Sequence, residues 1–91
     1  MSRPRIKKKV EWHCNFTHIT PVGQGIIQIE EILVSHEELE ALRLKDCLGL
    51  EQKQAAKAMN ISQPTFHRLL REARKKISDA IVNSKQIKIK S

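Results

Sequence analysis

The sequence predicts a small, mainly α-helical domain with three helices, preceded by an irregular basic arm and followed by a short strand. Three observations support this fold class. Apolar residues recur every three or four positions through residues 63–82, which is the period of an amphipathic helix. Two shorter stretches within residues 35–59 are bounded by helix-capping and helix-ending residues. Residues 86–90 alternate apolar and charged side chains, as a half-buried strand does. The expected parts are a basic arm and irregular segment at 1–25, a helical domain at 26–83, and a strand and tail at 84–91.

The length and composition indicate one small cytoplasmic domain. Ninety-one residues support only a modest core, and aromatic residues make up 3% of the chain, so aliphatic side chains must build that core. No run approaches the ~20 apolar residues that a membrane span needs, and no apolar signal-peptide stretch follows the basic N-terminus. Two cysteines are too few for a disulfide scaffold. We therefore expect a cytoplasmic protein with reduced thiols and no membrane contact.

The segments before the first helix give weak signals. Residues 1–25 are punctuated by two prolines, Pro4 and Pro21, and hold no helical period. Residues 27–34 are rich in isoleucine, leucine and valine, which favours either a short strand or an irregular apolar segment.

The first helix is predicted from its two ends. Ser35 and Glu38 have the spacing of a capping box, in which each side chain accepts from the backbone amide of the other residue. The helix is expected to run through residues 36–47 and to end where Gly49 adopts a positive φ. The side chains expected in the core are Leu39, Leu42, Leu44 and Cys47. The acids expected to form a solvated face, turned away from a polyanion, are Glu37, Glu38 and Glu40.

The second and third helices are separated by a short turn. Ala55 and Ala56, in the stretch 51–59, are small enough for another helix to approach closely. Asn60 tolerates the positive φ that ends the second helix, and Ser62 is placed to cap the third, with a proline tolerated in its first turn. The apolar positions of the third helix are Phe66, Leu69, Leu70, Ala73, Ile77, Ala80 and Ile81. These intervals meet the steric requirements of a helix-turn-helix, although an ordinary helical hairpin meets some of them too.

The charges of this chain are segregated along the sequence. The chain holds 17 lysines and arginines against 10 acids, with a pI near 9.8. Residues 1–9 carry five cations and no acid, whereas residues 30–46 carry six acids and two cations, and residues 51–76 carry seven cations and two acids. Such segregation favours a polyanionic partner on one side of the protein.

The last residues are expected to form a strand that needs a partner. In residues 86–90, Ile87 and Ile89 lie on one face of the predicted strand and two lysines on the other, where they would guard its edge. A lone strand of this kind would be prone to aggregate. We therefore expect it to pair either with the segment around 27–34 or with its own copy in a second subunit.

The chain resembles a known family along nearly its whole length. The segments that carry the resemblance are "RPR", "PVG", "EELEALRLKD", "GLEQKQAAKAMNISQPTFHRLLREARKKISDAIVN" and the terminal "IKI". They resemble uncharacterised protein family 0251, a group of small prokaryotic proteins predicted to bind DNA through a helix-turn-helix similar to region four of sigma-seventy factors. The resemblance implies a helix-turn-helix of the sigma region-four type, within the winged-helix-like superfamily, and double-stranded DNA as partner. Members usually have Ser or Thr where Glu51 stands, so the cap of the second helix departs from the family pattern.

The function expected is sequence-specific DNA binding in transcription regulation, with residues 62–82 as the recognition helix. The expected base contacts are Gln63, Thr65, His67 and Arg68, because Gln can pair with adenine and Arg with guanine in the major groove. The expected phosphate contacts are Lys53, Lys57, Arg71, Arg74 and Lys75. The arm residues expected in the minor groove are Arg3, Arg5 and Lys7. A homodimer and a contact with RNA polymerase are further expected partners. The alternatives are a protein-interaction module that docks on the transcription machinery and an RNA-binding protein.

Other site chemistries receive little support from the sequence. His13, Cys14 and His18 are the cluster closest to a metal site, but structural zinc usually takes four ligands in paired spacings. No nucleophile stands beside an evident base, and no glycine-rich phosphate loop is present. We expect neither catalysis nor a cofactor.

Overall fold

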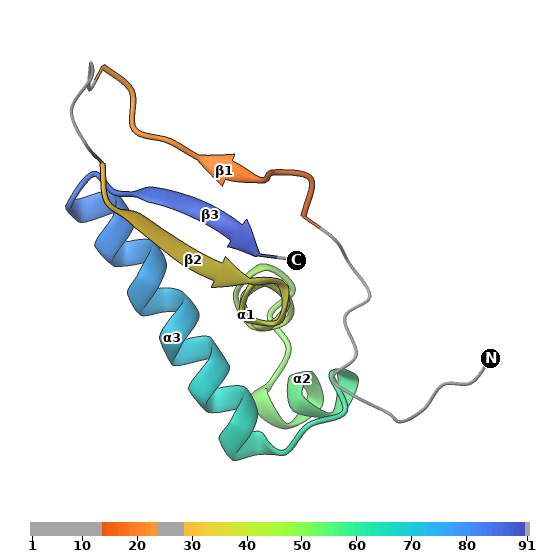
Figure 1. Cartoon of the computed structure of the whole chain (residues 1–91). Coiled ribbons are helices and arrows are strands. Elements are labelled where there is room, and N and C mark those ends of the chain that lie inside the picture. Colours follow the sequence, from red (N-terminus) through yellow and green to blue (C-terminus); the bar gives the residue numbers. More distant parts are fainter. Residues whose placement is uncertain (1–13, 24–28, 91) are drawn as a thin grey trace.

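The computed structural model describes residues 14–23 and 29–90, which form three α-helices and a small three-stranded mixed sheet (Figure 1). The predicted mainly helical globule with three helices is confirmed for these residues. The sheet also contains β1, a strand that we did not expect. In chain order, the elements are β1 (His18–Ile19), β2 (Glu31–Ser35), α1 (His36–Leu42), the π-helical turn η1 (Arg43–Cys47), α2 (Gln52–Ala58), α3 (Gln63–Val82) and β3 (Gln86–Lys90).

The sheet has β3 in its middle, antiparallel to β1 and parallel to β2. Ile87 and Ile89 of β3 are buried and the two lysines between and after them are exposed, so the predicted alternation is confirmed. The partner strand within the chain is also confirmed, because Ile32 lies opposite Ile87 and Val34 opposite Ile89 in the register of β2. The expectation that lysines guard a free edge was wrong, because β1 and β2 lie on the two sides of β3.

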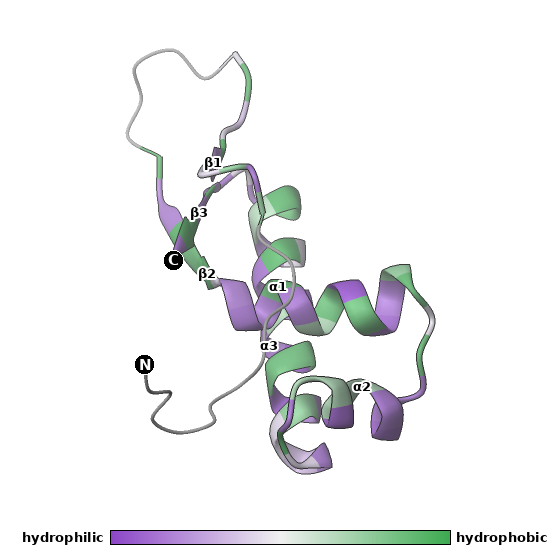
Figure 2. Ribbon diagram, turned by 90° about the vertical axis from the view of Figure 1, so that its right-hand side faces the viewer, coloured by the Kyte–Doolittle hydropathy of each residue, from purple (hydrophilic) through white to green (hydrophobic). Residues whose placement is uncertain are grey.

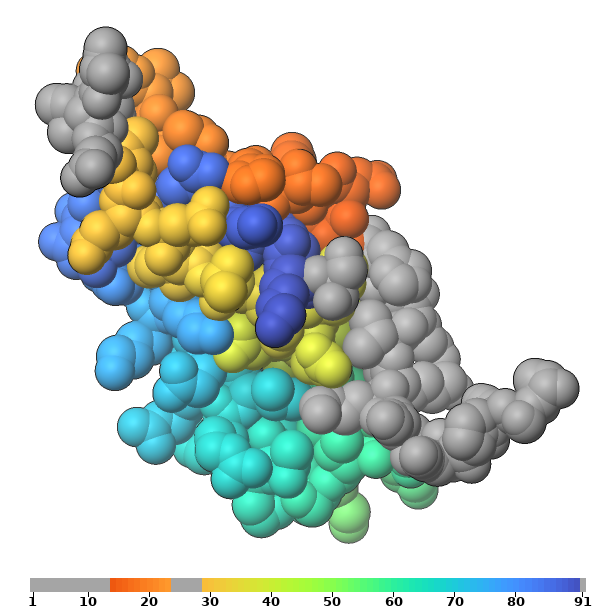
Figure 3. Space-filling model, viewed as in Figure 1, coloured from red at the N-terminus to blue at the C-terminus, as the bar shows by residue number. Residues whose placement is uncertain are grey.

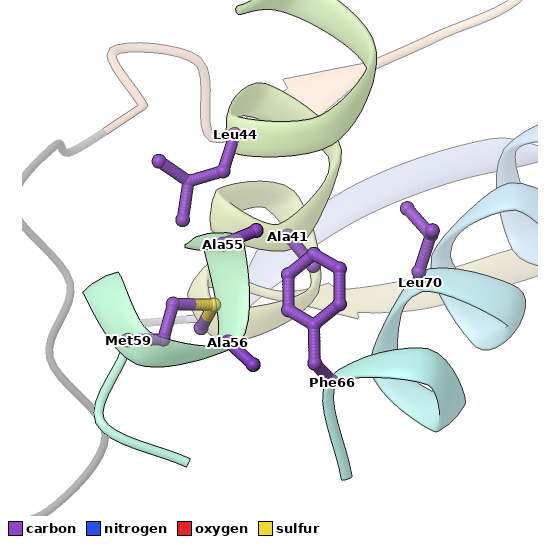
Figure 4. Close-up of a cluster of buried hydrophobic side chains, with 7 residues drawn as sticks. All are labelled: Ala41, Leu44, Ala55, Ala56, Met59, Phe66 and Leu70. Atoms are coloured by element: carbon purple, nitrogen blue, oxygen red, sulfur yellow. The ribbon is translucent and has the colours of Figure 1, made fainter. Parts of the chain in front are cut away.

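Two hydrophobic clusters hold the helices and the sheet together. The first joins α1, η1, α2 and the first half of α3, and its buried side chains are Ala41, Leu44, Ala55, Ala56, Met59, Phe66 and Leu70 (Figure 4). The second joins the sheet to the second half of α3, and its buried side chains are Val34, Ala80, Ile87 and Ile89. Helix α3 thus runs from α2 at one end of the molecule to the sheet at the other (Figure 1).

Helix α1 begins as predicted and ends differently. The Ser35 hydroxyl accepts from the Glu38 amide at 3.1 Å, and the Glu38 carboxylate accepts from the Ser35 amide at 3.0 Å, which confirms the capping box. The α-helix stops at Leu42 and continues as the π turn η1 before Gly49 reverses the chain with φ of 75°. Cys47 is exposed, and our prediction that it is buried was wrong, because the wider π turn shifts the side-chain directions away from the α-helical period.

Three other burial predictions were wrong. Glu38 and Glu40 are 7% and 2% exposed, so they do not form a solvated face. Each instead contacts a cation: Lys76 Nζ lies 3.0 Å from a Glu38 carboxylate oxygen, and Arg43 Nε lies 2.9 Å from one of Glu40. Pairing of this kind is what permits a carboxylate to be buried. Ile81, predicted in the core, is 71% exposed, because the second cluster covers only the neighbouring side of α3.

Candidate nucleic-acid interface

The turn between α2 and α3 is closed by backbone hydrogen bonds. Asn60 has φ of 59°, as predicted for the residue that ends α2. The Asn60 amide donates to the Lys57 carbonyl and the Ile61 amide to the Ala56 carbonyl, both at 3.0 Å. Ile61 is half-buried against the first cluster. The turn therefore fixes the position of α3 relative to α2.

The cap at the start of α3 uses one of the predicted base-contact residues. The Ser62 hydroxyl accepts from the Thr65 amide at 3.3 Å and donates to the Thr65 hydroxyl at 2.9 Å. This confirms Ser62 as the N-cap, with Pro64 in the first turn. Thr65 is half-buried, and its hydroxyl is engaged in the cap, so it is less available than its predicted neighbours to meet a base.

The first half of α3 has one buried side and one exposed polar side. Phe66 and Leu70 are 0% and 2% exposed and pack against α1 and α2 (Figure 4). Three of the predicted base-contact residues are exposed, namely Gln63, His67 and Arg68. Gln52 at the start of α2 lies 3.4 Å from the His67 ring nitrogen, so the two helices also meet at this surface.

The packing of α2 against α3 depends on small and flexible side chains. Ala55 and Ala56 are buried and lie beside the Phe66 ring, and Met59 completes the contact (Figure 4). Glu51 stands at the N-cap of α2, where its amide donates to the Gln54 side chain at 3.2 Å. Gln54 thus supplies a first-turn hydrogen bond to α2.

The predicted phosphate contacts are all exposed, and one of them is held by an acid. Arg74 donates two hydrogen bonds to Asp46 of η1, at 2.6 and 3.1 Å. The Arg74 guanidinium lowers the pKa of Asp46, and the carboxylate raises the pKa of Arg74. The exposed cations on α2 and α3 that make no ion pair with a described residue are Lys53, Lys57, Arg68, Arg71 and Lys75.

Sequence reasoning missed Asp46 as a partner of Arg74 because the two residues are 28 positions apart. No local pattern links them. The one available signal is that Asp46 is the last acid of the acidic stretch and sits at the end of the first predicted helix.

A hollow of about 500 Å³ opens between α2 and the start of α3. The residues that line it are Lys53, Ala56, Lys57, Asn60, Ile61, Ser62 and Gln63. Two of the five unpaired cations therefore border the turn itself. The surface of α3's first half and α2 forms the lower end of the molecule in Figure 3.

Some predicted site residues lie outside the described part of the chain. Arg3, Arg5 and Lys7 of the arm, and His13, belong to this group. Among residues 14–23 and 29–90, no group of three or more His, Cys, Asp or Glu side chains is placed to hold a metal ion. Nor is any helix within these ranges long and apolar enough to cross a membrane.

Comparison with known proteins identifies the family. A family model described as "Protein of unknown function DUF134" matches residues 1–91. The UPF0251 protein Teth39_0655 of Thermoanaerobacter pseudethanolicus is 45% identical over 89 residues, which cover 98% of this chain and 75% of the relative. The chain belongs to the UPF0251 family. The predicted resemblance is thereby confirmed.

Two further UPF0251 relatives match to a similar extent. The UPF0251 protein TTE1845 of Caldanaerobacter subterraneus is 46% identical over 98% of this chain and 75% of its own length. The UPF0251 protein DehaBAV1_0135 of Dehalococcoides mccartyi is 47% identical over 98% of this chain and 76% of its own length. No solved structure matches the chain.

Proposed function

We propose that this UPF0251 protein binds double-stranded DNA in a sequence-specific manner and regulates transcription. In this proposal α2, the turn and α3 are a helix-turn-helix of the sigma region-four type, and α3 is the recognition helix. The observation that carries the proposal is the two-sided first half of α3. Its buried side is anchored by Phe66 and Leu70, and its opposite side presents Gln63, His67 and Arg68 to solvent.

The exposed side chains of α3 match the chemistry of base edges. Gln63 can form paired hydrogen bonds with adenine, and Arg68 with guanine, in the major groove. In the first turn of α3, the Gln63 amide has no intrahelical partner, because Pro64 lacks an amide hydrogen and the Thr65 amide donates to Ser62. This amide and the positive end of the helix dipole attract phosphate. Because the turn is closed by hydrogen bonds, these groups are held on a rigid support.

The cations of α2 and α3 that form no ion pair within the chain support a contact with the phosphate backbone of DNA. Lys53 and Lys57 border the hollow beside the start of α3, and Arg71 and Lys75 continue along the exposed side of that helix. None of the four pairs with a described acid. Cations without an intramolecular partner exchange their counterions for phosphates at no loss of an existing ion pair.

The burial and position of the aromatic rings favour duplex DNA over single-stranded RNA as the partner. Recognition of single strands relies on exposed aromatic rings on which bases stack. Phe66 on α3 is fully buried, and Phe16, the exposed ring among the described residues, precedes β1. Docking on another protein would call for apolar anchors on the exposed side of α3's first half, where polar and cationic groups stand instead.

The proposal is tested by selecting bound duplexes from a random pool with the full chain at moderate salt. We expect one motif to be enriched. On that motif, Arg68→Ala should cost about 1–3 kcal/mol and relax the preference at one base position, whereas Lys57→Ala should weaken specific and nonspecific duplexes alike.

The matched control is Glu72→Ala, an exposed residue on the same helix with the opposite charge, which should leave the base preference unchanged. The proposal fails if no motif is enriched. The assignment of α3 fails if Arg68→Ala keeps the wild-type preference while its circular dichroism shows an intact fold.

A further inference from the structure

We propose that an apolar surface at the C-terminal end of α3 is the interface through which two copies of this chain form a dimer. The surface, here called the end patch, consists of Ile19 at the end of β1, Val22 shortly after it and Ile81 from the last turn of α3, which line one hollow. Their exposed fractions are 48%, 92% and 71%. Contiguous apolar patches of this kind on a soluble domain usually mark a contact surface.

The end patch combines protruding side chains with a hollow. A cavity of about 290 Å³ lies between the segment that follows β1 and the end of α3, and Ile19, Val22 and Ile81 line it together with Ala80. Figure 1 shows these two segments at the end of the molecule that holds the sheet. A two-fold interface brings the same surface of both subunits together. Because the exposed apolar side chains and the hollow lie on one surface, each copy can insert a valine or isoleucine into the hollow of the other.

The charges beside the end patch suit a second copy of a basic chain. Lys85, at the rim of the cavity, contacts Asp79 at 3.0 Å and Glu30 at 3.1 Å, so its charge is compensated within the chain. Two molecules that each carry a net charge of +7 repel one another over most of their surfaces. Near the end patch, the acids Asp79 and Glu30 are balanced by Lys85 and by Lys75, whose charge also acts on Asp79, so the repulsion between two copies is weaker there. The same balance disfavours a nucleic acid or an acidic protein as the occupant.

The position of the end patch leaves the start of α3 accessible. A helix of 20 residues is about 30 Å long, and Figure 2 shows α2 and the sheet on opposite sides of α1. The two α3 helices laid end to end would span about 60 Å, and their starts come closer together when the helices are inclined. Half-sites one DNA turn apart, about 34–36 Å, fall within this reach. This spacing argument rests on the proposed function; the self-association does not.

The experiment is sedimentation equilibrium of the full chain without DNA, from about 1 to 100 μM. We expect a concentration-dependent monomer–dimer equilibrium. Val22→Asp and Ile81→Asp should each raise the dissociation constant at least about tenfold, because each places two symmetry-related carboxylates in an apolar contact. Val22 lies outside the helices, so its substitution tests the interface without perturbing α3.

The matched control is Leu48→Asp. It places the same charge on another exposed aliphatic side chain (56% exposed), which lies between η1 and α2, away from the end patch. It should leave the dissociation constant within about twofold of wild type. A monomer throughout the concentration range overturns the proposal, whether another segment or another protein covers the patch. So does an equal effect of Leu48→Asp and Ile81→Asp. A dimer that binds no duplex would refute only the proposed function, and a monomer that selects a motif would refute only the dimer.

Discussion

Replacing Phe66 by alanine should destabilise the domain more than any other single truncation on α3. The ring is fully buried among side chains of α1 and α2. Burial of an aromatic ring removes about 150–250 Å² from water, which at about 25 cal/mol per Å² corresponds to about 4–6 kcal/mol. Part of this contribution remains with the alanine methyl group, so we expect a loss of about 3–5 kcal/mol. A 91-residue domain has a total stability of about 5–14 kcal/mol.

The measurement is urea unfolding followed by the helical circular dichroism signal. Phe16→Ala is the matched control, because it removes the same ring from a site that is 64% exposed. It should change the free energy of unfolding by less than about 0.5 kcal/mol. A loss below about 1.5 kcal/mol for Phe66→Ala, or an equal loss for both variants, would refute the conclusion that this ring joins α2 to α3.

Two further substitutions test the turn and the surface ion pair. Asn60→Ala should cost about 1–2 kcal/mol in thermal unfolding because its φ is 59°, whereas Asn60→Gly should be nearly neutral, and equal effects would contradict this origin. The Arg74 guanidinium lowers the pKa of Asp46, so the pair stabilises the fold above the unfolded pKa of about 3.9 and this contribution is lost as pH falls through the folded pKa. Because both side chains are well exposed, Asp46→Asn should cost less than about 1 kcal/mol at pH 7 and reduce the loss of stability on acidification; an unchanged acid limb in urea titrations would argue against the pair.

The parts of the fold that sequence predicts are those with a local cause. The Ser35 capping box, the positive φ of Asn60, the Ser62 cap and the alternation around Ile87 each depend on residues within four positions. Sequence spacing determines such contacts directly. The strand β1 was missed because two residues carry no periodic signal.

The features that sequence did not predict depend on distant residues. Lys76 meets Glu38 across 38 positions, and this contact makes burial of that acid possible. The exposure of Ile81 depends on how far the sheet extends along α3. Within the candidate site, the helical period correctly placed Gln63 and Arg68 on the exposed side, whereas the cap bond of Thr65 was not anticipated.

The ion pairs within the chain lead to a last prediction, on the salt dependence of DNA binding. Residues 51–76 contain seven cations. Two of them, Arg74 and Lys76, form ion pairs with acids in the folded chain and are therefore not available to phosphate. The five that remain are Lys53, Lys57, Arg68, Arg71 and Lys75. Each phosphate contact contributes about 0.9 to the slope of log K against log salt on duplex DNA.

With the arm deleted (residues 1–9), the slope should therefore not exceed about 4.5 in magnitude, and it should be steeper by about 0.9 for each arm cation that meets a phosphate in the full chain. Titrations of both proteins on one duplex at several salt concentrations measure the difference. A slope near 6 without the arm would mean that about two more cations meet phosphate, either Arg74 and Lys76 released from their acids or lysines outside residues 51–76. Identical slopes would mean that the arm contacts no phosphate. The ion pairs with Glu38 of α1 and Asp46 of η1 would then determine how many of the cations in residues 51–76 are free to contact DNA.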